Sequence, residues 1–162
     1  MARSSQPVPP GFHTVTPTLT VRNAAQAIDF YKKALGAEER MRMAGPDGKI
    51  SHAELKIGDS IIFLNDENPA MGCQSPQTLG GSTGGFYLYV EDVDKAFQRA
   101  IDAGGKATHP VTDMFWGDRM GNLSDPYGYT WTLSTHTQDL TEQEMEEGAK
   151  AFYAQMAQKK TA

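Results

Sequence analysis

The sequence predicts an α+β fold in which two βαβββ modules form a curved, mostly antiparallel sheet, with helices outside it and a further helix at the C-terminus. The first observation behind this prediction is an internal repeat. Segment 19–37, LTVRNAAQAIDFYKKALGA, matches segment 88–106, LYVEDVDKAFQRAIDAGGK, at a constant shift of 69 residues, so Leu19 aligns with Leu88. Each copy reads as an alternating strand followed by an amphipathic helix.

The second observation is a set of short strand-like segments after each predicted helix. Turn signals separate them, such as GPDG at 45–48 and DPYG at 125–128. The expected strands are 38–43, 49–57 and 60–65 in the first half, and 106–111, 119–124 and 129–135 in the second. Together with the repeat, they give the order βαβββ twice.

Capping residues predict where the helices begin. Asn23, with Gln26 three residues later, and Asp92 stand at the start of the two repeated helices. Thr141 and Glu144 form a capping box that opens the C-terminal helix. The apolar residues of that helix recur with helical spacing, which predicts docking on the body or on a partner subunit: Met145, Ala149, Phe152 and Met156.

These elements divide the chain into five parts. We expect a flexible N-terminal tail at 1–11, the first module at 12–65 and the second at 85–137. A Gly/Ser/Pro-rich linker without periodicity joins the modules at 66–84, and the C-terminal helix occupies 138–162.

Composition narrows the classes of partner. A net charge of −5 gives no electrostatic reason to bind nucleic acid or an anionic membrane. The polar, Pro-rich start MARSSQPVPPG is neither a signal peptide nor a membrane span, and Cys73 is the single cysteine, in a loop without a basic neighbour. We therefore expect a cytoplasmic protein with an inert thiol, whose partner is a small molecule or a second copy of itself.

One face of the predicted sheet carries hydroxyl groups. Because side chains alternate along a strand, Val15, Leu19 and Val21 would face the helix and leave a row of threonines on the other side. The residues expected on this concave face are Thr14, Thr16, Thr18, Thr20, Tyr87, Tyr89, Thr130, Thr132, His52 and Glu54. Such a face is typical of a polar ligand pocket, although threonine is also simply common in strands.

The stretch FWGDRMG at 115–121 leads from a loop into the seventh expected strand. Trp116 could stack on a planar ligand, and Arg119 could pair with a carboxylate or phosphate. The alternatives are that Asp118 and Arg119 pair locally and that Trp116 covers a dimer seam. The remaining histidines have no acidic partner at ligand spacing and are expected in loops: His13, His109 and His136.

The modules and several motifs resemble the vicinal oxygen chelate superfamily, also called the glyoxalase/bleomycin resistance/dioxygenase superfamily. The motifs are AIDFYKKALGAE, YVEDVDKAFQRAIDAGG and DPYGYTWTL; more narrowly, GPDGKISHAELKIGDSIIFLND with DMFWGDRMGNLSDPYGYTWTLSTHTQDLT is similar to PhnB-like proteins. In catalytic members, His, Gln or Glu on the first, fourth, fifth and eighth strands hold a divalent metal. The matching positions here are Thr16, Ile62 or Phe63, Gly85 and Thr132, none of which is an imidazole or a carboxylate.

The resemblance implies a homodimer and leaves three functions open. The first is a binding protein with a metal-free, hydroxyl-lined cleft formed by Thr16, Tyr87, Trp116, Asp118, Arg119 and Thr132. The second is an enzyme (a lyase, isomerase or transferase) in which His52 and Glu54 act as acid and base or bind a metal at a site that the family does not use. The third is a non-catalytic dimer with a vestigial cavity. No cofactor is predicted, and the ligand cannot be identified from the sequence.

Overall fold

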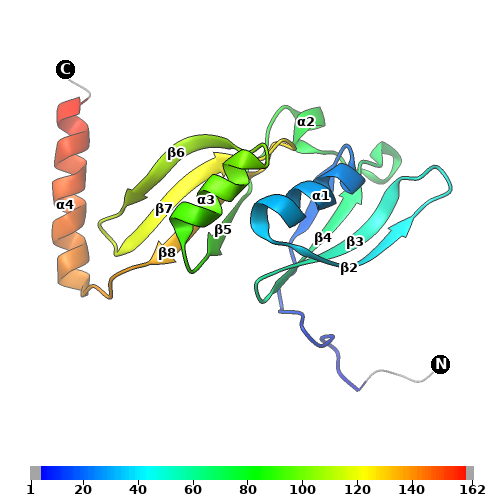
Figure 1. Cartoon of the computed structure of the whole chain (residues 1–162), viewed down its shortest axis with the longest axis horizontal. Helices are drawn as coiled ribbons and strands as arrows, with labels where there is room; N and C mark the ends of the chain where they lie inside the picture. The colour runs from blue at the N-terminus through cyan, green and yellow to red at the C-terminus, as the bar shows by residue number, and fades with distance from the viewer. Residues whose placement is uncertain (1–4, 160–162) are drawn as a thin grey trace.

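The computed structural model describes residues 5–159 and contains both predicted modules (Figure 1). The first module consists of β1 (Thr18–Val21), α1 (Ala24–Leu35), β2 (Glu38–Ala44), β3 (Ile50–Ile57) and β4 (Ser60–Asp66). The second consists of β5 (Gly85–Tyr89), α3 (Val93–Asp102), β6 (Lys106–Asp113), β7 (Asp118–Ser124) and β8 (Thr130–His136). The predicted order βαβββ is confirmed in both halves.

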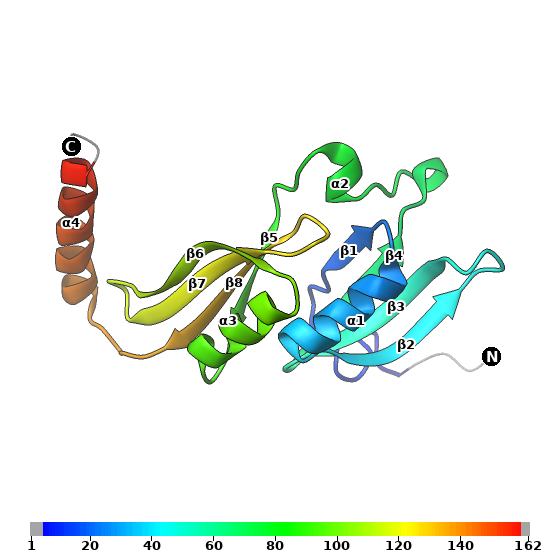
Figure 2. The same ribbon diagram turned by 45° about the horizontal axis from the view of Figure 1, so that its top comes forward.

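Each module has its own four-stranded sheet. The strand orders are β1-β4-β3-β2 and β5-β8-β7-β6, and no pairing joins β1 to β5 among the described residues. In each sheet the first strand pairs with the last in parallel, and the other pairings are antiparallel. In both views α1 and α3 lie side by side on the same side of the sheets, and they pack against each other (Figures 1 and 2). The opposite face of each sheet carries no helix, and we call it the open face.

The core lies between the helices and the sheets. In the first module Leu19, Val21 and Ile28 are fully buried, and in the second Trp131 and Leu133 are almost fully buried. These residues follow the period of two in the strands and the helical period in α1, which is why the sequence pattern predicted their elements. Burial of this apolar surface is the main stabilising contribution to each module.

The start of the first strand differs from the prediction. Regular pairing begins at Thr18, and Val15, which was expected to face the helix, is 78% exposed. Pro17 has no N–H group to donate to a neighbouring strand, although its carbonyl accepts from Phe63 N at 2.8 Å. The chain therefore leaves the sheet before Pro17, and the alternation of threonines cannot be extended to Thr14 and Thr16.

The linker contains two short helical turns that its composition did not indicate. A 3₁₀ turn, η1 (Pro69–Met71), precedes α2 (Pro76–Leu79), and each has a proline at its start and a glycine at its end. Ser75 caps α2 and is fully buried, because its N–H and hydroxyl both donate to Glu67 Oε1, at 2.8 and 2.6 Å. This contact fixes the linker against the end of β4.

The C-terminal helix α4 (Glu142–Lys159) stands beside the tip of the second module (Figure 1). The predicted capping box is present: Thr141 N donates to Glu144 Oε2 at 2.8 Å, and Glu144 N donates to Thr141 Oγ1 at 3.3 Å. Phe152 packs on Phe115, with ring centroids 5.5 Å apart. Residues 160–162 of the expected helix and 1–4 of the expected tail lie outside the described residues. Within 5–159, no helix has the length and apolar character needed to span a membrane.

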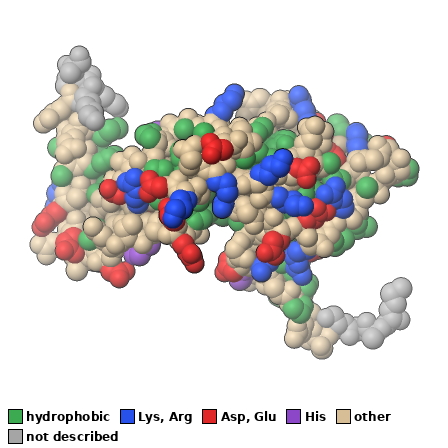
Figure 3. All heavy atoms as spheres, in the orientation of Figure 1, with side chains coloured by type: hydrophobic (Ala, Val, Ile, Leu, Met, Phe, Trp, Pro, Cys, Tyr) green, Lys and Arg blue, Asp and Glu red, His purple; other side chains and the backbone are tan. Residues whose placement is uncertain are grey.

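The helix-bearing face of the molecule has a mixed charge. Acidic and basic side chains alternate over α1 and α3 without a large area of one sign (Figure 3). Arg119 and Lys95 are paired with Asp94 and Asp92 on this part of the surface. This face therefore has no continuous basic patch of the kind that binds nucleic acid.

Candidate functional site

The open face of the second module brings together three residues of the predicted site. Asp118, at the start of β7, accepts hydrogen bonds at Oδ2 from the hydroxyls of Tyr87 (3.1 Å) and Tyr89 (3.0 Å) on β5. Trp116, just before β7, is a further hydrogen-bond partner of this carboxylate. Asp118 itself is only 3% exposed, whereas Tyr87 and Tyr89 are 46% and 65% exposed. The tyrosine rings lie 5.1 Å apart, so a buried acid fixes an exposed aromatic pair.

The hydrogen bonds set the ionisation of this group. Burial opposes the charged form of Asp118, but donors from His136, Tyr89 and Tyr87 outweigh it and lower the pKa of the carboxyl below its usual value. The hydrogen bond to Asp118, followed by burial, raises the pKa of Tyr89 to about 12. At neutral pH the site therefore holds the Asp118 carboxylate beside a Tyr89 phenol that remains protonated.

His136, the last residue of β8, forms the other side of the site. Its Nδ1 lies 2.7 Å from Asp118 Oδ1, and its Nε2 lies 3.1 Å from Asp139 Oδ1. The hydrogen bond to Asp118 and then that to Asp139 raise the pKa of His136 above its usual value. The expectation that His136 is a loop histidine without an acidic partner is wrong. Its partner is eighteen positions earlier, across the β7–β8 pairing that places Asp118 opposite His136.

Thr132 lies on the same open face, one strand in from the edge. It pairs in register with Tyr87 on β5 and with Asn122 on β7, and paired residues share a face of the sheet. The Asn122 Oδ1 atom is buried and has no hydrogen-bond partner among the described residues. A buried acceptor without a partner is costly to the folded protein.

Arg119 is not part of this group. Its guanidinium makes a two-pronged contact with Asp94 on α3, through Nε and Nη2 at 2.8 Å each, and Nη1 donates to Asp113 at 3.0 Å. It therefore lies on the helix-bearing side of β7, opposite to Asp118. The alternative that Asp118 and Arg119 pair with each other is not observed either, because neighbouring residues of a strand point to opposite faces.

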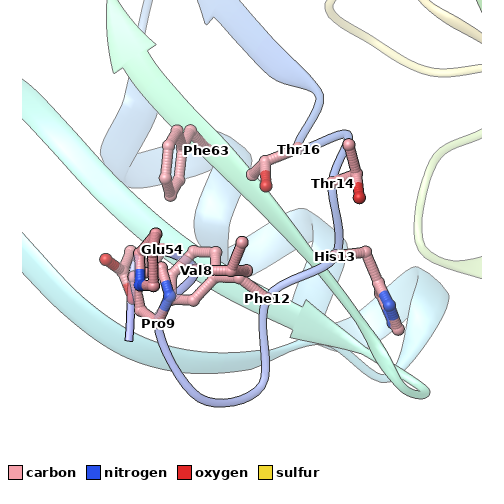
Figure 4. Close-up of a pocket in the computed structure, with 9 residues that line it drawn as sticks. Val8, Pro9, Phe12, His13, Thr14, Thr16, Glu54 and Phe63 are labelled. Carbon is pink, nitrogen blue, oxygen red and sulfur yellow. The ribbon is translucent and has the colours of Figure 1, made fainter. Parts of the chain in front are cut away.

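The open face of the first module holds the predicted residue Thr16 in a separate pocket of about 520 Å³. The chain's own N-terminal segment forms one side of this pocket, through Pro7, Val8, Pro9 and Phe12. Figure 4 shows Val8 and Phe12 beside Glu54 and near Phe63, while the His13 side chain points away. The rings of Phe12 and Phe63 meet edge to face at 5.8 Å. Phe12 thus packs on the sheet, while residues 7–11, which belong to the expected tail of 1–11, remain exposed beside the pocket.

His52 and Glu54 project to this open face as the strand alternation predicted. His52 Nε2 lies 3.7 Å from Glu54 Oε1, which is longer than a hydrogen bond. The other carboxylate oxygen lies 3.7 Å from Arg40 Nη1, and the imidazole packs against the Phe63 ring at 4.7 Å. The two residues are neighbours, but Glu54 also lies near the guanidinium of Arg40, and His52 also packs on the ring of Phe63.

The positions that hold a divalent metal in catalytic relatives do not fit a metal here. Thr16 and Phe63 lie in the first module, and Gly85 and Thr132 in the second. A glycine and a phenylalanine offer no side-chain donor, and neutral hydroxyls are weak ligands. Within residues 5–159, no three His, Cys, Asp or Glu side chains gather as a metal site.

Three residues of this face were not included in the site predicted from sequence. Tyr89 was placed on the correct face by strand alternation, so the signal was present. His136 could be found only by knowing that β7 begins at Asp118 and that β8 ends at His136, because the strand pairing depends on these boundaries. Asn122 carried no signal, since an asparagine in a strand does not indicate an unpaired acceptor.

Comparisons with known proteins agree with this architecture. The profile of the Glyoxalase/Bleomycin resistance protein/Dioxygenase superfamily matches residues 11–133. An uncharacterised protein of Mycobacterium tuberculosis is 42% identical over 135 residues, which cover 82% of this chain and 79% of that protein. TioX from a Micromonospora species is 27% identical, with a TM-score of 0.61 over 76% of this chain and 98% of TioX.

A second solved structure shares the same fold. The PhnB protein from Bacillus cereus, described as a putative 3-demethylubiquinone-9 3-methyltransferase, shares the fold with a TM-score of 0.59. It is 18% identical, and the match covers 76% of this chain and 99% of that protein. The paired modules, the profile match and the identity to the mycobacterial protein lead to one conclusion. This chain belongs to the glyoxalase/bleomycin resistance protein/dioxygenase superfamily.

Proposed function

We propose that this protein binds a small planar molecule on the open face of the second module, without a metal ion. The observation that carries the proposal is the set of three aromatic residues, Tyr87, Tyr89 and Trp116, held around one buried carboxylate on a face that no helix covers. Exposed aromatic side chains are usually mobile. Here the hydrogen bonds to Asp118 hold the two tyrosine rings in place before any ligand arrives.

Such an arrangement favours binding in two ways. Fixed rings lose little conformational entropy when a ligand stacks on them, and stacking on tyrosine or tryptophan adds to the burial of apolar area. Polar groups near the rings, the Thr132 hydroxyl and the hydroxyls of the two tyrosines, would orient the ligand. This combination of a planar apolar surface with a few directed polar groups supports a ligand site.

The enzyme alternative has weaker support. It depends on His52 and Glu54, whose closest atoms are 3.7 Å apart, and the carboxylate is already near Arg40. The adjacent pocket is lined largely by apolar residues of the N-terminal segment, with Phe12 packed on Phe63. We therefore propose binding as the function and do not assign a reaction to this pair.

A Tyr87→Leu variant tests the site. We expect it to weaken binding of a planar ligand about tenfold, because one stacking surface and one hydrogen bond to Asp118 are lost while the fold remains. The ligand is first found with a thermal-shift screen of planar heteroaromatic compounds, since a molecule that binds the folded state raises its melting temperature. Isothermal titration calorimetry then gives the affinity of each variant.

Arg119→Lys is the comparison variant. Because the guanidinium is held by Asp94 and Asp113 on the other face, we expect the affinity to stay within about twofold of the unchanged protein. A ligand that is lost in Arg119→Lys and retained in Tyr87→Leu would contradict the proposal and favour an anion clamp. The absence of any hit from a broad screen would favour the third alternative, a dimer with a vestigial cavity.

We also propose that the protein forms a homodimer through the open face of the first module. Met41 and Met43 on β2 are 39% and 54% exposed, and they pair in register with Glu54 and His52 on that face. A row of exposed methionines on a sheet without a covering helix is apolar surface that a second copy would bury.

Light scattering at micromolar concentration is the measurement. We expect twice the mass of the chain, and a Met43→Glu variant is expected to raise the dimer dissociation constant at least tenfold, because it places a charge in the interface. Met71→Glu is the matched control, since Met71 is 76% exposed in η1. A monomeric protein, or equal effects of the two substitutions, would refute this interface.

A further inference from the structure

The two modules meet along a boundary that we call the seam. The internal repeat makes the two ends of this seam equivalent to each other. The shift of 69 that aligns Leu19 with Leu88 also aligns their strand partners, because Leu19 pairs with Leu64 and Leu88 pairs with Leu133. Residues 69 positions apart therefore occupy equivalent places in the two modules. The contents of the two ends of the seam can be compared residue by residue.

One end is filled by aromatic side chains. Tyr129, just before β8, reaches the edge strand β1, where its hydroxyl accepts from Thr20 N and donates to Thr20 O, both at 3.0 Å. Phe86 and Trp131 stack behind it, with centroids 4.6 Å apart. The remaining rings of this cluster are Phe30, Tyr31 and Tyr127. Tyr129 thereby satisfies two backbone groups of an edge strand.

The other end lacks all of these rings. The equivalent of Tyr129 is Ser60, and the equivalent of Thr20 is Tyr89. The other aromatic positions are replaced in the same way by Pro17, Gly58, Ile62, Arg99 and Ala100. What remains is a groove of about 750 Å³, whose lining includes Gly58, Ser60 and Tyr89.

The edge of β5 offers hydrogen bonds to this groove. β5 pairs only with β8, and Val90 N donates to Ser134 O at 2.8 Å. Because backbone groups of a parallel strand alternate between its two sides, the N–H and C=O of the preceding residue, Tyr89, face away from β8. They are the equivalents of the two Thr20 groups that Tyr129 satisfies.

The groove has apolar walls, and its lining also carries the carboxylates Asp59, Glu91 and Asp92 and the cations Lys95 and Arg99. Leu35, Ile57 and Ala96 line it, and Arg99 lies beside them. Arg99 Nε donates to Ala34 O at 3.1 Å, but no carboxylate pairs with this guanidinium within residues 5–159. The other cation in the lining, Lys95, is paired with Asp92 at 2.8 Å. An anionic group is therefore complementary to Arg99.

We propose that this groove is a second small-molecule site, which takes a hydroxyaryl carboxylate. The ring lies between the apolar walls, the hydroxyl bonds the Tyr89 N–H and C=O as Tyr129 does at Thr20, and the carboxylate pairs with Arg99. The groove shares Tyr87 and Tyr89 with the open-face site proposed above, but the proposal does not depend on that site, because it uses the backbone edge of β5 and Arg99 rather than the ring faces around Asp118.

The experiment titrates the full-length protein with 6-hydroxy-2-naphthoate by calorimetry and ¹⁵N NMR. Ser60→Tyr supplies the missing counterpart of Tyr129, and we expect it to weaken binding at least tenfold. Ser51→Tyr, the same change on exposed β3 outside the groove lining, is expected to stay within twofold. The probe without a hydroxyl, 2-naphthoate, is expected to bind roughly three- to tenfold more weakly.

A second variant, Arg99→Gln, tests the charge of the groove without filling its volume. Arg99→Gln is expected to weaken 6-hydroxy-2-naphthoate about threefold while leaving neutral 2-naphthol unchanged. A probe that Ser60→Tyr retains and Trp116→Leu loses would be bound at the open face, and this would overturn the groove site alone. Equal binding by Ser60→Tyr and Ser51→Tyr would overturn it as well. The groove site would also be overturned if the probe did not bind at millimolar concentration. A change of molecular mass in the Ser60→Tyr variant would overturn it too, because it would show that a second copy occupies the groove.

Discussion

An Asp125→Ala variant is expected to unfold at a markedly lower urea concentration, with a loss of about 3–4 kcal/mol in the free energy of unfolding. Asp125 is only 6% exposed and accepts four hydrogen bonds. Two come from side chains, Tyr31 Oη at 2.7 Å and Trp131 Nε1 at 2.8 Å. Two come from the backbone of its own turn, Tyr127 N and Tyr129 N at 2.9 Å. Removing the carboxylate leaves buried donors without a partner.

The effect should reach both modules. Tyr31 belongs to α1 in the first module, while Asp125 and Trp131 belong to the second, so this carboxylate is a polar link across the seam. Burial, and then the charge of Asp125, raise the pKa of Tyr31 well above its usual value, so its hydroxyl donates throughout the neutral range. Tryptophan fluorescence and far-ultraviolet circular dichroism should report the same lowered midpoint.

Asp113→Ala is the control for this prediction. Asp113 is an aspartate of the same module with a 77% exposed side chain and one contact, to Arg119, and its removal should leave the midpoint nearly unchanged. Asp125→Asn keeps the shape and one acceptor, and should fall between the other two. Equal midpoints for Asp113→Ala and Asp125→Ala would show that the four hydrogen bonds contribute nothing net.

The modules themselves could be predicted because their signals are local. Alternation of apolar residues in LTV and LYV marked the strands, and Asn23 and Asp92 marked the helix starts that the structure confirms, with cap bonds to Gln26 N and Lys95 N. The repeat strengthened the prediction of each module, because the same strand and helix signals occur in both copies. Signals within about ten residues along the chain were sufficient for this level of structure.

Contacts between distant residues could not be predicted in the same way. The DPYG segment was correctly expected as a turn, but nothing local shows that its Asp125 accepts from Tyr31, 94 positions earlier. The division into two unpaired sheets, rather than one curved sheet, also depends on the packing of α1 on α3. Such contacts depend on how the folded elements pack together, and they leave no periodic pattern in a single sequence.

The site was predicted only in part, and the position of strand boundaries explains the error. The expected seventh strand began at Arg119, which left Asp118 in the loop and allowed both residues to point into one site. In the structure β7 begins at Asp118, so the two side chains lie on opposite faces. The expected eighth strand, 129–135, stopped one residue short of His136, whereas β8 ends at His136 and pairs it with Asp118, which explains why the histidine was missed.

An Asp118→Asn variant is expected to change the stability of the protein most in mildly acidic solution. The amide keeps the size of the carboxyl but cannot accept from all the donors that surround it, His136, Tyr87, Tyr89 and Trp116. We expect a loss of about 1–3 kcal/mol in the free energy of unfolding. Because the tyrosine rings are no longer fixed, binding of a planar ligand at the open face should weaken about tenfold as well.

The sign of the pH dependence follows from the two pKa shifts. The pKa of Asp118 is lowered in the folded state, so its contribution is present above the unfolded value of 3.8 and is lost as the pH falls through the folded value. The pKa of His136 is raised, so its contribution is complete below 6.5 and is lost as the pH rises through the folded value. The difference in stability between Asp118→Asn and the unchanged protein should therefore be largest between about pH 4 and pH 6.5.

Urea titrations from pH 3 to pH 9, with an NMR titration of the His136 ring protons, measure both effects. Asp118→Asn should lower the pKa of His136 because it removes the larger of the two causes of the shift, and Asp139→Asn, at an exposed carboxylate, should lower it less. Asp139→Asn should also leave ligand affinity unchanged, since Asp139 does not hold the tyrosines. If the stability profiles of Asp118→Asn and the unchanged protein run parallel over the whole range, Asp118 and His136 act independently. The hydrogen bonds that hold the exposed aromatic pair would then carry no measurable energy, which would contradict the proposed site.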